Sequence, residues 1–223
     1  MKRKIKLLNR IAQPGLDVLD TNLYEVGEDL EDPHGILVRS ANMLEMPLGP
    51  ELLAIARAGA GVNNIPIQRC TRQGIVVFNT PGGNANSVKE MTILGLLMAA
   101  RNVLGGIQWV QGLGKQENLA ATVEANKANF VGHELTGHTL GVVGLGAVGG
   151  RVANTAQHMG MQVIGCDPFL SVESAWGLSH SVQRADTYRE MYPRVDYLSL
   201  HVPVTAETRG MIDKEALSQM QDG

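Results

Sequence analysis

The chain is poor in cysteine and has no long hydrophobic run. Its two cysteines, Cys70 and Cys166, lie far apart and form no C-x-x-C motif. This favours free buried thiols in a reducing compartment over a disulfide framework. The longest apolar stretch covers only residues 93–100, whereas a membrane-spanning helix needs roughly 20 residues. We therefore expect a cytoplasmic protein without a membrane partner.

Charged and aromatic residues are also scarce. Charged residues make up 18% of the chain, and 19 Lys and Arg against 22 Asp and Glu leave a net charge of -3. No global positive field is available to hold nucleic acid, so an anionic ligand must be met by a few local cations. Aromatic residues are only 4%, while the 26 glycines and a hydrophobic share of 44% suit a parallel α/β protein with a buried core and many tight turns.

Short apolar runs alternate with helix-sized segments in the first part of the chain. We expect strands at 5–8, 35–38, 52–56 and 75–78. A helix over 65–73 is expected to end at Gly74, because glycine is the preferred residue just beyond a helix C-terminus. Strand and helix in alternation predict a parallel sheet with helices on both faces, and we assign 1–90 to a first domain.

The same alternation returns in the second part of the chain, which we assign to a second domain over 91–223. The expected strands are 139–143, 161–166 and 195–201, and the expected helices are 148–158 and 212–220. Between the two sets, Ser87 and Glu90 have the spacing of a capping box and predict a long helix over 91–109, buried between the domains. The more polar segment 111–135 is expected to be a solvated helix or a connecting arm.

A glycine motif carries the strongest chemical signal. Gly144, Gly146 and Gly149 form G-x-G-x-x-G after an apolar strand and at the start of a helix, 18 residues before Asp167 at the end of the next strand. In a dinucleotide site the glycines permit the tight turn, the approach of the pyrophosphate and close helix packing, and the acid binds the adenine ribose. Because its charge repels a 2′-phosphate, Asp167 predicts NAD over NADP. The alternative is that the glycines only tighten a strand-to-helix turn.

Other site chemistries find less support. No P-loop and no G-x-S-x-G elbow is present, and the six histidines form no convincing metal-ligand set. His201 stands apart because it ends a strand at the edge where such sheets bind ligands, so we leave open a cofactor contact and a purely structural role.

Two arginines follow strands of the first domain. Arg39 and Ser40 end one strand, and Arg57 precedes the glycine-rich loop at 58–61. Ligands bind beyond the carboxyl ends of parallel strands, and guanidinium forks suit carboxylate or phosphate, so a small acid with more than one negative charge is the expected substrate. Surface arginines without a ligand are the alternative.

Several ordered blocks of the chain resemble the D-isomer-specific 2-hydroxyacid dehydrogenase family. The blocks are 35–40 (GILVRS), 56–64 (ARAGAGVNN), 74–81 (GIVVFNTP), 144–149 (GLGAVG), 167–168 (DP) and 200–203 (LHVP). The resemblance implies a flavodoxin-like substrate domain and an NAD-binding Rossmann domain, and a homodimer or homotetramer at full length. It implies substrate-binding roles for Arg39, Ser40, Arg57, Gly59, Ala60 and Asn84, and cofactor contacts at Ala147, Val148, Asp167, Pro168, Val202 and Pro203. Asn63 departs from the family pattern, since many relatives carry Asp there.

The resemblance also points to missing machinery. The family's base, a His assisted by a Glu, and its substrate-binding Arg lie on segments after the helix that here ends near Gly223, so no catalytic residue can be placed. We therefore expect an inactive fragment of a longer enzyme, with both domains incomplete at their C-terminal ends. As the first expectation for the longer enzyme, we take NAD-dependent oxidation of D-3-phosphoglycerate to 3-phosphohydroxypyruvate in serine biosynthesis. Reduction of hydroxypyruvate or glyoxylate, and a non-catalytic NAD-binding scaffold, are the alternatives.

Overall fold

The computed structural model describes residues 2–115 and 118–222 and divides into two compact units. Unit 1 is Met1–Asn84 and unit 2 is Ala85–Gly223. The sequence-based boundary lies after residue 90, whereas the compact units divide where a long helix begins at Ala85. Each unit is described by itself below.

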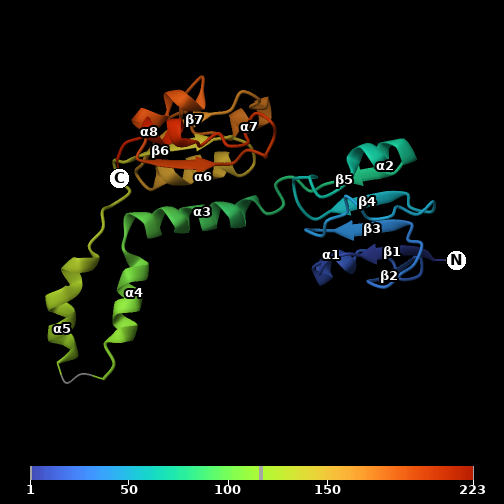
Figure 1. Ribbon diagram of the computed structural model, residues 1–223, viewed down its shortest axis with the longest axis horizontal. Helices are drawn as coiled ribbons and strands as arrows, with labels where there is room; N and C mark the ends of the chain where they lie inside the picture. Colours follow the sequence, from blue (N-terminus) through green and yellow to red (C-terminus); the bar gives the residue numbers. More distant parts are fainter. Residues whose placement is uncertain (1, 116–117, 223) are drawn as a thin grey trace. The chain divides into compact units, whose positions relative to one another are not determined.

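Unit 1 is built on a five-stranded sheet in which every pairing is parallel (Figure 1). Its strands are β1 (Arg3–Leu7), β2 (Tyr24–Gly27), β3 (Gly35–Val38), β4 (Ala54–Arg57) and β5 (Val76–Phe78), and its helices are α1 (Gln13–Leu16) and α2 (Ile67–Gln73). The strand order is β2-β1-β3-β4-β5, which is the flavodoxin-like order. Gly74 ends α2 with φ 72°, a left-handed conformation, as predicted.

Unit 2 contains a four-stranded parallel sheet in the order β8-β7-β6-β9, the arrangement of a Rossmann half. Its strands are β6 (Thr139–Val143), β7 (Gln162–Cys166), β8 (Gln183–Arg184) and β9 (Tyr197–Leu200), and the elements around them are α3 (Ala85–Ala100), α6 (Gly149–His158), α7 (Val172–Trp176), η2 (Tyr188–Glu190), η3 (Tyr192–Arg194) and α8 (Lys214–Ser218). Leu96 and Ala100 of α3 share one core cluster with Val152 and Ala156 of α6. The predicted α/β class with two parallel sheets is confirmed.

Two expectations about the first helix of unit 2 are wrong. The helix begins at Ala85, so Ser87 lies inside its first turn, and the carboxylate of Glu90 accepts a hydrogen bond from Asn86 instead of closing a capping box. The predicted run over 91–109 is broken after Ala100 and resumes as α4 (Val103–Gly112), with a 69° bend between the two helices. Several apolar side chains of this run are exposed in the described structure, among them Met91, Leu104 and Val110.

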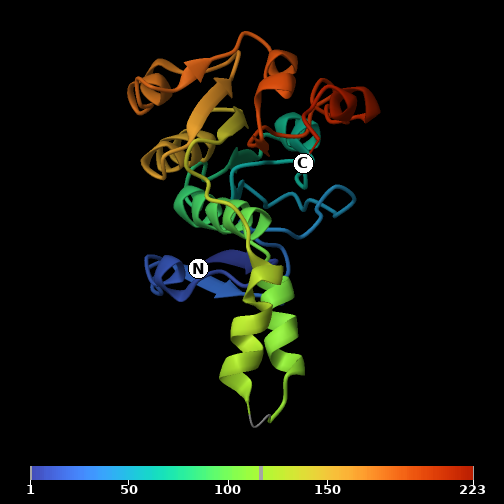
Figure 2. The same ribbon diagram turned by 90° about the vertical axis from the view of Figure 1, so that its left-hand side faces the viewer.

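The segment after the bend forms a hairpin with α5 (Leu119–Asn126) and η1 (Lys127–Phe130). In both views α4 and α5 run side by side away from the sheet of unit 2 (Figures 1 and 2). The Trp109 and Phe130 rings pack with centroids 5.2 Å apart and join the two arms of the hairpin. The segment expected to be a solvated helix or a connecting arm, 111–135, contains the end of α4, α5 and η1, and its residues 116 and 117 lie outside the described part of the chain.

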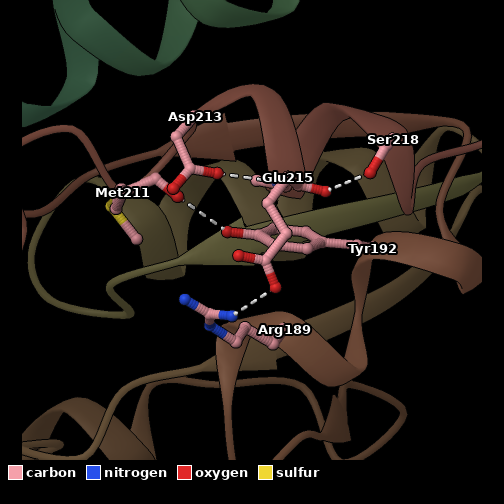
Figure 3. A network of polar contacts seen from close by, with 7 residues as sticks. Arg189, Tyr192, Met211, Asp213, Glu215 and Ser218 are labelled. Atoms are coloured by element: carbon pink, nitrogen blue, oxygen red, sulfur yellow. Dashed lines mark hydrogen bonds and ion pairs between the residues drawn. The ribbon is translucent and has the colours of Figure 1, made fainter.

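The last helix of unit 2 is held by polar contacts (Figure 3). Asp213 caps α8 by accepting a hydrogen bond from the Ala216 amide, and Glu215 pairs with Arg189 of η2 at 3.4 Å. The buried Tyr192 donates its hydroxyl to the Met211 carbonyl oxygen at 3.1 Å. These contacts attach residues 211–218 to the β8–β9 connection.

Three further observations concern the described residues alone. Both cysteines are buried and unpaired. No group of three or more His, Cys, Asp or Glu side chains within 2–115 and 118–222 is arranged to hold a metal ion. No single helix in these ranges has both the length and the hydropathy to cross a membrane, and α3 with α4 passes that test only as a bent pair.

Candidate cofactor-binding site

The three motif glycines meet different surroundings in the loop between β6 and α6. Gly144 has φ 86°, and a Cβ atom there would lie 2.7 Å from the His201 carbonyl oxygen. A Cβ atom on Gly149 would overlap the carbonyl oxygen of Gly144, whereas one on Gly146 would meet nothing within 4 Å. The fold therefore requires glycine at the first and third positions. The second position faces open space, as the approach of a ligand to the backbone requires.

The N-terminus of α6 is free to accept an anion. Val148 occupies the N-cap position, no side chain caps the helix, and its first turn holds no acidic residue. The first amide groups of a helix have no partner inside the helix, and together with the helix dipole they favour a phosphate group. The local structure thus fits the pyrophosphate of a dinucleotide.

Asp167 links the glycine loop to the end of β7. One carboxylate oxygen accepts the Leu145 amide at 2.8 Å and the other accepts the Phe169 amide at 2.9 Å. Beside it lies a cavity of about 770 Å³, within the size range of ligand pockets. Its lining includes Leu145, Asp167, Pro168, His180, Arg184 and Asp186. The predicted ribose-binding acid therefore borders a cavity next to the predicted phosphate site.

The segment after β9 forms the other border of the glycine loop. The His201 amide donates to the Val143 carbonyl oxygen at 2.7 Å, and Val202 lies 2.8 Å from the Cβ position of Gly144. The His201 ring hydrogen-bonds to Ser199 at 2.9 Å, and burial lowers the pKa of the imidazole. The Pro203 carbonyl accepts the Thr208 hydroxyl at 2.6 Å. The structure therefore gathers the predicted cofactor residues at one end of the unit 2 sheet.

Most of the predicted substrate residues of unit 1 lie in a first loop, 39–41 after β3, or at the end of β4 and in a second loop, 58–61. Asn9 shapes the first loop. The Asn9 carboxamide oxygen accepts the backbone amides of Arg39, Ser40 and Ala41 at 2.8, 3.0 and 3.0 Å. Sequence analysis did not single out Asn9. The available signal was its place, as a polar residue just after the first expected strand.

Arg57 joins the two loops. Its Nε donates to the Arg39 carbonyl oxygen at 3.0 Å, and a terminal nitrogen donates to the Gly61 carbonyl oxygen. The Gly59 amide donates to the Thr80 hydroxyl at 2.8 Å, which fixes the second loop. Arg57 thus uses some of its guanidinium donors in hydrogen bonds within the protein. The sequence-based prediction of a guanidinium that faces a ligand did not include these bonds.

Two predicted substrate residues of unit 1, Ala60 and Asn84, remain to be placed. Asn79 donates to the Ala60 carbonyl oxygen at 2.6 Å and so supports the second loop, another contact that sequence analysis missed. Asn84 is exposed at the end of unit 1. Within residues 2–115 and 118–222, no side-chain hydrogen bond joins Asn84 to either loop. The substrate roles of these residues stay predictions.

Comparison with known proteins decides the family. Residues 93–223 match the model of the D-isomer specific 2-hydroxyacid dehydrogenase, NAD binding domain. The chain belongs to this family. The family prediction and its cofactor, NAD, are thereby confirmed, whereas the roles of single residues are not tested.

The relatives of this dehydrogenase-family chain are longer proteins. D-3-phosphoglycerate dehydrogenase of Bacillus subtilis is 32% identical over 212 residues, which cover 93% of this chain and 38% of the relative. The enzyme of that name from Methanocaldococcus jannaschii is 36% identical over 200 residues, covering 88% of this chain and 36% of the relative. The chain therefore spans less than two fifths of the length of these relatives.

A solved structure extends the similarity to both units. The crystal structure of NAD+-bound 3-phosphoglycerate dehydrogenase from Entamoeba histolytica is 27% identical, with a TM-score of 0.71. The match covers 99% of this chain and 69% of that one.

Proposed function

We propose that the protein acts in the NAD-dependent oxidation of D-3-phosphoglycerate to 3-phosphohydroxypyruvate, a step of serine biosynthesis. The observation that carries this proposal is the open glycine loop at the uncapped start of α6, with Asp167 at the next strand end. When bound, NAD supplies the nicotinamide ring that accepts a hydride. The relatives, which are D-3-phosphoglycerate dehydrogenases, support the substrate.

In this proposal, unit 2 holds the cofactor with few side chains. The amides at Gly146, Ala147 and Val148 bind the pyrophosphate, because that helix start has no competing cap. Asp167 accepts the ribose hydroxyls, Pro168 borders the same cavity, and the segment from His201 to Pro203 flanks the loop on its other side.

Two glycine variants test the cofactor site. Gly146→Ala should leave the fold intact, since its Cβ meets nothing within 4 Å. It should weaken NAD binding about tenfold or more, because the methyl group blocks the backbone from the phosphate. Calorimetric titration with NAD measures this, with the thermal unfolding midpoint as the check on folding. Gly149→Ala is the matched control and should instead lower the unfolding midpoint. An unchanged dissociation constant in Gly146→Ala would contradict the site.

The two loops of unit 1 are proposed to hold the acid. Arg39 and Arg57 supply the positive charge that a doubly anionic substrate needs. The bonds from Arg57 to the Arg39 and Gly61 carbonyls leave it fewer free donors, which favours a plain carboxylate and keeps a hydroxypyruvate or glyoxylate reductase as the second candidate. NADH absorbance with a panel of hydroxyacids, measured on a protein of the relatives' full length, separates them. Equal or faster turnover without the phosphate would refute the first choice.

We further propose that residues 1–223 alone bind NAD without measurable turnover. Among the described residues, no histidine beside the glycine loop hydrogen-bonds to a carboxylate, so an assisted general base is not identified there. Turnover by these residues alone would overturn this. NAD binding without turnover in a chain of the relatives' full length would favour the non-catalytic scaffold.

We also propose an assembly state and a cellular location for the protein. A homodimer or homotetramer is supported by exposed apolar side chains on the hairpin, including Leu104, Ile107 and Val110 of α4. Sedimentation velocity measures the assembly state. The two buried free thiols support a reducing, cytoplasmic location, and the nearly balanced charge supports a small-molecule partner over nucleic acid.

A further inference from the structure

We propose that Asp186, acting through Arg184, is a second determinant of the preference for NAD over NADP. The inference rests on the proposed cofactor site of unit 2 and concerns the cavity beside Asp167. Both Arg184 and Asp186 line that cavity.

Sheet register brings these charges to neighbouring strand ends. β7 pairs with β8 in parallel, with Gly165 opposite Arg184, and the Ala185 amide donates to the Gly165 carbonyl oxygen at 2.9 Å. Two residues beyond this pair, Asp167 follows β7 and Asp186 follows β8. The strand ends that border the proposed ribose site therefore carry a second carboxylate, Asp186, in addition to Asp167.

An arginine at this place conflicts with selection for NAD. A nearby arginine is the usual means by which such a fold accommodates the 2′-phosphate of NADP, because the guanidinium fork matches a phosphate group. Arg184 is 85% exposed at its side chain and lines the cavity, so it is accessible to a charged ligand. Some other feature must keep it from acting as a phosphate receptor.

Asp186 resolves the conflict. Its carboxylate pairs with the Arg184 guanidinium at 3.0 Å, and its own backbone amide donates to the Glu190 carboxylate at 3.2 Å, which fixes the residue. The exposed pair adds little to stability. Its effect is electrostatic, since it cancels the guanidinium of Arg184, the one arginine among the described residues that line the cavity, and leaves the charge of Asp167 uncompensated. The charged side chains of the cavity lining then sum to a net negative charge, which repels a 2′-phosphate.

The test compares two probes that carry only the adenosine half of the cofactors, 5′-AMP and adenosine 2′,5′-bisphosphate. Calorimetric titration at about pH 8 keeps both phosphates doubly charged. Asp186→Asn should raise the affinity for the bisphosphate relative to 5′-AMP about tenfold, the effect of removing one unit charge near a divalent anion. The gain should shrink at high salt.

Two further variants isolate the cause. Adding Arg184→Gln to Asp186→Asn should abolish the gain, because the released guanidinium carries it. Glu124→Gln is the matched control, since Glu124 also forms an exposed ion pair, with Lys127 on the hairpin, and the substitution changes the net charge equally. It should leave the affinity ratio unchanged.

The outcomes separate this inference from the proposed function. If the protein binds NAD and Asp186→Asn leaves the ratio unchanged, or if the gain persists in the double variant, the role of Asp186 is refuted and the cofactor site stands. If the unaltered protein binds neither NAD nor 5′-AMP, the cofactor site fails and this inference fails with it.

Discussion

His201 is a half-buried imidazole at the end of β9, with Ser199 as its ring partner. Burial lowers its pKa because the charged ring loses hydration. The neutral ring therefore stabilises the fold above the ordinary imidazole value of about 6.5, and that stability is lost as the pH falls toward the lower folded value. We expect the thermal unfolding midpoint to drop between pH 7.5 and pH 5, and His201→Gln to reduce the drop.

The comparison of the two pH values controls for packing. Gln can keep a hydrogen bond to Ser199 and has no charge to gain, so any loss of packing lowers the midpoint equally at both pH values. An equal drop in the variant and in the unaltered protein would show that other groups cause the acid sensitivity.

At the scale of single residues, the sequence predicts the position of those residues that belong to a local pattern of strand, turn and helix. Gly144, Gly149 and Asp167 lie where the motif requires them, because the spacing of a strand, a turn and a helix fixes their positions. Asn9 and Thr80 escape such a pattern. Their contacts join loops that are 30 and 21 residues apart in sequence, and only the assembled sheet brings those loops together.

At the scale of elements, strands that contain a continuous apolar run are the most predictable. β3 and β6 have the predicted bounds, since a strand buried on both faces needs a continuous apolar run. β2 and β8 were not predicted. β2 is an edge strand with two exposed middle residues, and β8 has only two residues, so neither shows an apolar run.

The break between α3 and α4 has a tertiary cause that the apolar pattern does not reveal. The Ala100 carbonyl oxygen accepts the His133 amide at 3.0 Å, and Gly132 packs so closely against Ala100 and Arg101 that a Cβ atom would clash with their backbone. The two ends of the hairpin are thus closed against each other. The apolar pattern of 91–109 contains no information about His133, which lies 33 positions after Ala100.

A glycine inside a helix and a glycine just beyond a helix predict opposite effects of the same substitution. Gly95 lies inside α3 with nothing within 4 Å of its Cβ position, so Gly95→Ala should raise the unfolding free energy of unit 2 by about 0.5–1 kcal/mol. Gly74 has φ 72°, so Gly74→Ala should lower that of unit 1 by about 1–2 kcal/mol. Urea unfolding followed by circular dichroism measures both. Effects of the same sign would contradict this account.

At the scale of the whole molecule, each hydrophobic core belongs to one unit. Ile36, Val38 and Ile55 centre the core of unit 1, while the two clusters of unit 2 draw their members from 93–211. Because each of these clusters, as formed by residues 2–115 and 118–222, has its members in one unit, we expect damage to one core to leave the other unit folded. Ile55→Ala removes a fully buried side chain and should destabilise unit 1 by about 2–5 kcal/mol.

Scanning calorimetry with and without 5′-AMP measures this independence. We expect two transitions, of which Ile55→Ala lowers one, while 5′-AMP raises only the other because a ligand stabilises the unit that binds it. Val163→Ala, at a buried position of β7, is the matched change in unit 2 and should lower the transition that 5′-AMP raises. Adenosine binding should survive in Ile55→Ala, because the glycine loop, Asp167 and the cavity all lie in unit 2. A single transition that responds to both substitutions would mean that the two cores fold as one cooperative structure, and the cofactor site could not then be treated as a property of unit 2 alone.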